Sequence, residues 1–206
     1  PTSVTAFLSV GPKAAGFAVI GRVFYIAFEG IQPDWSTAFI IISILTMAIG
    51  NIIALVQTNI KRMLAYSSIA HAGYILIGII TSTYESLQAV ISYLMIYTFM
   101  NMGAFAIIIL LDKGEEIQDY NGLAKYRPLV SAIMLIFMFS LVGIPPTAGF
   151  IAKFNLFVTA INGGYIWLVV IAVVFSAISA FYYLRIVMNM YMKESLTDGH
   201  KINLTP

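Results

Sequence analysis

The sequence predicts an all-α integral membrane protein with about six transmembrane helices, the fifth of which is broken. Three observations lead to this class. Hydrophobic residues make up 60% of the 206 and charged residues only 10%, so the apolar surface exceeds what polar groups could cover on a globule of this size. Apolar stretches of about 20 residues, the length that crosses a bilayer, recur between short polar connections. One stretch is longer than a single span and carries adjacent prolines near its middle.

Each apolar stretch predicts one membrane crossing. The predicted spans cover residues 3–27, 36–58, 62–81, 86–111, 127–162 and 165–192, within a single transmembrane domain over residues 1–206. The fifth holds Pro145 and Pro146, each of which removes a backbone donor and disfavours helix at the residue before it. We therefore expect two half-helices separated at Gly143–Pro146, with Gly149 beside the break.

Lysine and arginine occupy alternate connections, which predicts the orientation of the spans. Cytoplasmic loops retain these residues. The turns "EGIQPD", "TSTYE" and "NGG" contain none. The other connections carry Lys61, Arg62, Lys113, Lys125, Arg127, Lys193 and Lys201. This alternation supports the number of spans and predicts that the loops with Lys61, Lys113, Lys125 and Lys193 are cytoplasmic.

The composition argues against several classes of function. The chain has no cysteine, which excludes disulfides, thiolate nucleophiles, iron–sulfur clusters and cysteine-type zinc sites. Two histidines do not make a metal site alone, and a net charge of +2 without a basic cluster argues against nucleic acid. The loop "DKGEEIQDYNGLAKYRP" lacks phosphate-binding or dinucleotide spacing. We expect no cofactor in this chain and interpret its methionines and aromatic residues as packing.

Two lysines lie at membrane depth, Lys13 in the first span and Lys153 early in the second half of the broken one. An ionisable group there is costly and normally faces a protein interior or a water-filled cavity, often on a proton path. The alternative is that helix-end carbonyls hold each lysine for structural reasons. Arg22 and Arg185 lie nearer helix ends, where we expect them to reach the interface or bind a neighbouring helix.

The break gives Lys153 its predicted role. The two prolines cannot donate to the carbonyls of Leu141 and Val142, and free acceptors at this depth are tolerated only where backbone is buried or lines a cavity. The half-helices also carry partial charges at their ends. Burial and the positive end of the later half-helix both favour the neutral amine of Lys153. Such a lysine can exchange a proton as its neighbours change charge.

His71 is a third candidate for proton transfer, because histidine titrates near neutral pH and can accept on one ring nitrogen while donating on the other. Its alternative role is a structural hydrogen bond across a helix interface. All nine carboxylates lie in connections, at helix ends or in the tail. A buried lysine in a pump needs an acidic partner. We expect that partner on another subunit or on a preceding part of a longer polypeptide, since the chain begins with Pro1 rather than methionine.

Three segments resemble the antiporter-like membrane subunits of respiratory complex I. They are "ALVQTNIKRMLAYSSIAHAGYILIG" (54–78), "GIPPTAGFIAKF" (143–154) and "PKAAGFAVIGRVF" (12–24). The resemblance covers essentially the whole chain. It implies the second inverted repeat of an antiporter-like fold, corresponding to helices eight to thirteen of about fourteen, with the first broken helix before Pro1.

The resemblance also implies a function. By this resemblance Lys13 matches the lysine of helix eight, and His71 matches the polar position of helix ten on the central hydrophilic axis. Lys153 matches the lysine of the second broken helix, from which the proton would leave. NADH oxidation and quinone reduction would take place on other subunits. The implied partners are the other complex I membrane subunits, the lipid bilayer and the missing N-terminal helices, in a bacterial inner membrane. A subunit of a multisubunit sodium/proton antiporter and a purely structural spacer remain as alternatives.

Overall fold

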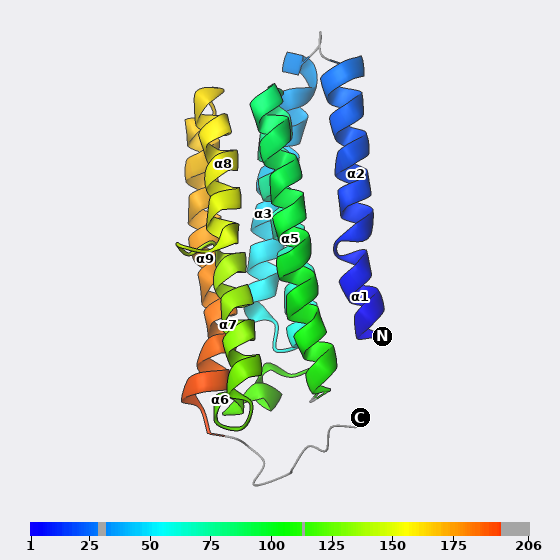
Figure 1. Ribbon diagram of the computed structural model, residues 1–206. Coiled ribbons are helices and arrows are strands. Elements are labelled where there is room, and N and C mark those ends of the chain that lie inside the picture. Colours follow the sequence, from blue (N-terminus) through cyan, green and yellow to red (C-terminus); the bar gives the residue numbers. More distant parts are fainter. Residues whose placement is uncertain (29–31, 113, 195–206) are drawn as a thin grey trace.

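The computed structural model describes residues 1–28, 32–112 and 114–194, which form a bundle of helices with roughly parallel axes (Figure 1). The elements are α1 (Thr2–Leu8), α2 (Gly11–Arg22), the π-helical turn η1 (Val23–Ala27), α3 (Gln32–Val56), α4 (Ile60–Thr81), α5 (Tyr84–Leu111), the 3-10 turn η3 (Ile117–Tyr120), α6 (Leu123–Tyr126), α7 (Pro128–Val142), α8 (Ala148–Asn162) and α9 (Ile166–Met192). Within these ranges the structure is helical apart from turns and one bridging pair, Asn59 with Glu116. The all-α prediction is confirmed.

Five segments of the described chain are long and apolar enough to cross a bilayer. They are Thr2–Ala27, Trp35–Val56, Ile60–Thr81, Tyr84–Leu111 and Ile166–Met192. Helices α7 and α8 are each too short, but they lie end to end in one column (Figure 1) and make a sixth crossing. The predicted span 127–162 is therefore broken, as its prolines indicated.

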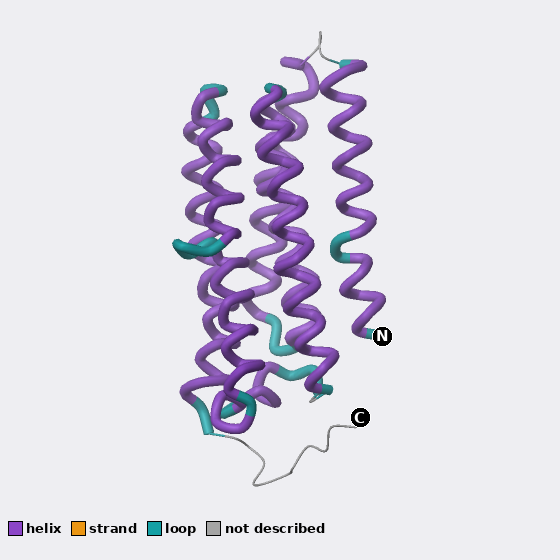
Figure 2. Tube along the Cα trace, viewed as in Figure 1, coloured by secondary structure: helices purple, strands orange, loops and turns teal. Residues whose placement is uncertain are grey.

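The first span is interrupted as well, although we expected one continuous helix. Pro12 has no N–H to donate to the carbonyl of Leu8, and it suits an early position of α2, where that donor is not needed. The hydroxyl of Ser9 accepts a hydrogen bond from the Asn101 amide of α5 at 2.6 Å. Figure 2 shows this interruption and the α7–α8 break at similar heights on opposite sides of the bundle.

Helix α4 forms the centre of the bundle and is buried along most of its length. Its first turn is capped by Asn59, whose side chain accepts from the Arg62 N–H at 3.0 Å. Helix α3 approaches it closely at small residues, since a Cβ on Gly50 would lie 2.5 Å from the backbone nitrogen of Ala70. Lipid is as apolar as leucine, so such close packing, rather than burial alone, holds membrane helices together.

One end of the bundle collects the basic connections. Lys61 lies in the first turn of α4, Lys125 lies in α6 and Lys193 follows α9. The start of α4, the short helix α6 and the end of α9 lie at the same end of the bundle (Figure 1). Lys113 and Lys201 fall outside the described residues. At the same end, the guanidinium of Arg185 donates to the carbonyls of Leu55 (3.4 Å) and Gln57 at the end of α3. Arg185 thus binds a neighbouring helix, one of the two roles that we expected for it.

Candidate functional site in the membrane interior

Lys153 of α8 reaches across the break to the end of α7. Its amine donates to the carbonyls of Val142 (2.7 Å) and Leu141 (3.3 Å) and to the Ser176 hydroxyl of α9 (2.8 Å). The side chain is 5% exposed. The lysine therefore occupies the two carbonyls that the prolines leave without donors. We expected the positive end of α8 to favour the neutral amine, whereas the carbonyl end of α7 favours the protonated one.

The predicted break residues contribute in different ways. Gly143 ends α7 in the left-handed conformation, with φ of 87°, and a cis peptide bond joins Pro145 to Pro146 before α8 begins. Gly149 lies in the first turn of α8, and its N–H donates to the hydroxyl of Ser140 at 3.0 Å. A Cβ at this position would collide with the Ser140 carbonyl oxygen. The absence of a side chain lets α8 start against the last turn of α7.

Lys13 lies on α2, just beyond the first interruption, and is half-buried. Its amine donates to the carbonyl oxygen of Ser68 on α4. It also lies 4.8 Å from the centre of the Tyr97 ring of α5. A cation over an aromatic face is attracted by about 0.5–2 kcal/mol, more when water is excluded. Like Lys153, this lysine is held by a backbone carbonyl and an aromatic ring.

His71 of α4 is buried between the two lysines, with 2% of its surface exposed. Its Nδ1 lies 2.8 Å from the Tyr93 hydroxyl of α5, and its Nε2 lies 3.2 Å from the Tyr183 hydroxyl of α9. A neutral imidazole has one donor and one acceptor. One tyrosine therefore accepts from the ring while the other donates to it, and moving a proton through the imidazole exchanges these roles.

Aromatic rings join the three ionisable groups into one polar row (Lys13, Tyr97, His71, Tyr74 and Lys153). The ring centres of Tyr97 and His71 are 4.8 Å apart. On the other side, the Tyr74 ring lies 5.9 Å from His71 and 5.0 Å from the amine of Lys153. The row crosses the bundle through α2, α5, α4 and α8 in turn. The structure thus brings together the three residues that the sequence singled out.

The tyrosines of this site were missed, because we interpreted the aromatic residues as packing. Tyr74 also lies 3.3 Å from the Asn51 amide nitrogen of α3, and Asn51 accepts from the Tyr182 hydroxyl of α9 at 3.0 Å. One signal was available in the sequence. Tyr93 and Tyr97 are four residues apart, which places both hydroxyls on one face of a helix.

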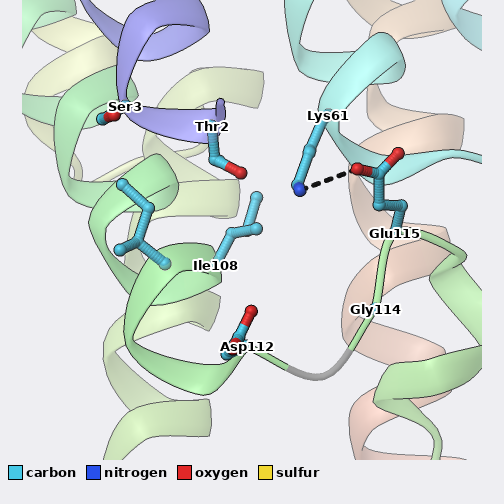
Figure 3. Close-up of a pocket in the computed structure, with 8 residues that line it drawn as sticks. Thr2, Ser3, Lys61, Ile108, Asp112, Gly114 and Glu115 are labelled. Carbon is cyan, nitrogen blue, oxygen red and sulfur yellow. Dashed lines mark hydrogen bonds and ion pairs between the residues drawn. The ribbon is translucent and has the colours of Figure 1, made fainter.

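The described carboxylates lie away from the polar row. One ion pair joins Lys61 to Glu115 at 2.9 Å, at the basic end of the bundle. Asn59 also donates to Glu115, at 2.8 Å. Lys61 and Glu115 border a pocket of about 320 Å³ that also contacts α1 and Asp112 (Figure 3). Among the described residues, no three His, Asp or Glu side chains come close enough to hold a metal ion.

The Lys61–Glu115 contact predicts a pH dependence at this end of the bundle. Hydrogen bonds from Lys61 and Asn59, with the charge of Lys61, lower the pKa of Glu115. A lowered pKa in the folded state means that the contact is formed above the ordinary carboxyl pKa and lost as pH falls through the lowered value. We expect Glu115→Gln to speed hydrogen exchange of the adjoining Ile60 amide at neutral pH.

Hydrogen exchange measured by mass spectrometry checks this, with the unmodified protein at each pH as the reference. At acidic pH the two proteins should exchange alike, since the carboxyl is then neutral. Equal exchange rates at neutral pH would show that the Lys61–Glu115 ion pair does not stabilise the hydrogen bond of the Ile60 amide. The Ile60 N–H is a suitable reporter because it donates to the Glu115 carbonyl at 2.8 Å.

Comparison with known sequences identifies the family to which this arrangement belongs. The membrane family described as "NADH:quinone oxidoreductase/Mrp antiporter, TM" matches residues 1–179. The chain belongs to this family. Two of its relatives are subunit N 1 of NADH-quinone oxidoreductase from Thermodesulfovibrio yellowstonii, 58% identical over 194 residues, and subunit N from Trichlorobacter lovleyi, 51% identical over 209 residues. They align with 94% and 100% of this chain, which spans 42% and 43% of their own lengths.

Solved structures of membrane complexes share the fold. A chain of respiratory complex I from Thermus thermophilus with bound aureothin superimposes with a TM-score of 0.79 at 34% identity, covering 94% of this chain and 43% of that one. A chain of the Mrp complex from Dietzia sp. gives 0.85 at 29% identity, covering 94% and 37%. The multi-pass membrane fold is therefore that of antiporter-like subunits.

Proposed function

We propose that the protein containing this chain is subunit N of a proton-pumping NADH:quinone oxidoreductase, and that Lys13, His71 and Lys153 carry the proton. The observation that carries the proposal is the polar row, which places three proton-binding groups in one line across the membrane interior. The names of the relatives support the assignment to subunit N. NADH oxidation and quinone reduction would occur on other subunits, with no redox centre in this chain.

The contacts indicate how each group would act. The carbonyl end of α7 stabilises the protonated amine of Lys153 whereas burial favours the neutral one, so positive charge arriving nearby would favour release of its proton. A proton on Lys13 or His71 supplies such charge, because charges interact strongly away from water. His71 can pass a proton between Tyr93 and Tyr183 by exchanging its donor and acceptor nitrogens. Water would have to complete the path between each lysine and the histidine.

The described part of the row contains no carboxylate, so the charge that drives the cycle would come from outside it. We infer that neighbouring complex I membrane subunits and helices of the same polypeptide before Pro1 supply it, with this chain as helices eight to thirteen of about fourteen. The lipid bilayer surrounds the whole. In a bacterial inner membrane, the end with Lys61, Lys125 and Lys193 would face the cytoplasm, together with the loop that holds Lys113.

A sodium/proton antiporter subunit is the second candidate, since the Mrp chain superimposes with the higher TM-score of the two structures. Inverted membrane vesicles from a bacterium lacking the full-length gene, with and without the gene restored, separate the two. We expect restoration to return NADH-driven acidification and quinone reduction, without a requirement for sodium. Proton movement driven by an imposed sodium gradient, without NADH, would overturn the oxidoreductase assignment and support the antiporter.

A further inference from the structure

Four of the described groups meet the amine of Lys153, three through hydrogen bonds and one through an aromatic face. The carbonyls of Leu141 and Val142 can only accept hydrogen bonds. The face of the Tyr74 ring, 5.0 Å from the amine, attracts a cation but not a neutral amine. Ser176 differs from these three groups, because a hydroxyl both accepts and donates. It is therefore the one of the four that can also stabilise a lysine that has lost its proton.

Ser176 can change the direction of its hydrogen bond without moving its oxygen. The residue lies on α9 and is half-buried. Its Oγ is 2.8 Å from the Nζ of Lys153 and 3.3 Å from the carbonyl oxygen of Val142. When the lysine is protonated, the hydroxyl accepts from the ammonium and donates to Val142. A turn about the Cβ–Oγ bond would direct the same O–H to Nζ, at a distance that suits a hydrogen bond in either direction.

Both protonation states of Lys153 can be fully hydrogen-bonded at this site. The ammonium has three N–H groups, which meet Leu141, Val142 and Ser176. The neutral amine has two N–H groups, which can stay on the two carbonyls, and a lone pair that needs a donor. The turned hydroxyl of Ser176 supplies that donor. Since the lysine is only 5% exposed, a lone pair without a donor would be costly.

We propose that the Ser176 hydroxyl is a rotating hydrogen-bond partner of Lys153, which accepts from the protonated amine and donates to the neutral one. The lysine can then lose and regain its proton without displacement of α7, α8 or α9. This inference deepens the proposed function and rests on it, because the rotation matters only if Lys153 releases its proton. A purely structural contact would need the hydroxyl as an acceptor alone.

Threonine and valine at position 176 test the need for a hydroxyl, because the two side chains have the same shape. In the full-length subunit within its complex, we expect Ser176→Thr to retain about half or more of the NADH-driven acidification of inverted vesicles, and Ser176→Val to lower it about tenfold. Both variants should assemble, since the carbonyls of α7 still hold the ammonium. Equal activities, or a more active valine variant, would overturn the proposal.

O-methylserine at position 176 separates donation from acceptance. Its ether oxygen can accept from the ammonium, but it has no proton to donate to the neutral amine. We expect this variant to pump as slowly as Ser176→Val. Full activity with the ether would show that the hydroxyl only accepts, and would overturn the proposal. Ser176→Ala adds no atoms and should show the same loss even if larger side chains hinder assembly, so full activity in this variant would also overturn the proposal.

The matched control is Ser179→Ala, one turn further along α9. The Ser179 hydroxyl donates to the Ser176 carbonyl at 2.6 Å and is not among the hydrogen-bond partners of Lys153. This variant should keep both acidification and quinone reduction. Lys153→Ala, measured on the same membranes, separates the two proposals. If it stops pumping while Ser176→Ala does not, the role of the hydroxyl alone is wrong. Normal pumping in both variants would overturn the proposed function as well.

Discussion

Replacing Lys153 with alanine should lower NADH-driven acidification and quinone reduction together, by about a hundredfold or more, while the complex still assembles. The change removes the amine that donates to the Val142 carbonyl at the α7–α8 break and that we propose carries the proton. In the proposed function pumping and electron transfer are coupled, so blocking one step of proton transfer would slow both. Acidification of inverted vesicles and the rate of quinone reduction, recorded on the same membranes, measure this result. Lys61→Ala at the exposed end is the control and should retain both activities.

Lys153→Arg distinguishes proton transfer from a structural role. Arginine keeps the positive charge and can donate to the carbonyls at the end of α7, but it does not release its proton. We expect this variant to assemble and remain inactive. Recovery of pumping with arginine would show that the cation only satisfies the helix-end carbonyls. Pumping per electron that is unchanged in Lys153→Ala would lead to the same conclusion.

Gly149→Val should prevent stable assembly of the complex. This is the largest structural effect that we expect from a single substitution. Even the Cβ of Gly149→Ala would collide with the Ser140 carbonyl oxygen. This oxygen belongs to the backbone, so a side-chain rotation cannot relieve the clash. Since α7 and α8 are also tied by Lys153, the two half-helices cannot separate without breaking those hydrogen bonds. We expect the alanine variant to lose about 1–3 kcal/mol of stability and the valine variant more.

The amount of assembled complex on native gels and its thermal midpoint measure this effect. Gly16→Ala on α2 is the matched control, since nothing lies within 4 Å of a Cβ at that position. It should behave as the unmodified protein. Equal thermal midpoints for Gly149→Ala and Gly16→Ala would mean that α8 does not start against the last turn of α7.

The break could be predicted because proline acts on its own neighbours in the chain. The same local chemistry indicated that the carbonyls of Leu141 and Val142 would need donors. It did not identify Ser176, since that hydroxyl reaches Lys153 from another helix, 23 residues further along. The interruption beside Pro12 follows from the same chemistry, yet one proline early in a span gives a weaker signal than an adjacent pair.

The tyrosines around His71 show a different limit. Tyr93 and Tyr183 come from helices α5 and α9, and only the packing of both against α4 brings their hydroxyls to one imidazole. In apolar helices that are rich in aromatic residues, local pattern does not separate a hydrogen-bonded tyrosine from one that only packs. The sequence therefore identified the ionisable residues of the polar row but not the groups between and around them.

The surroundings of Lys153 should make this position unusually intolerant of substitution. An ammonium has three N–H donors, and they meet three acceptors here, on Leu141, Val142 and Ser176. Histidine supplies at most two N–H donors, and a carboxylic acid supplies one O–H donor. Either residue would therefore leave at least one of these acceptors without a hydrogen bond, even if it could carry a proton. Restoring function after loss of this lysine would therefore require simultaneous substitutions on α7 and α9. Single mutations rarely provide them.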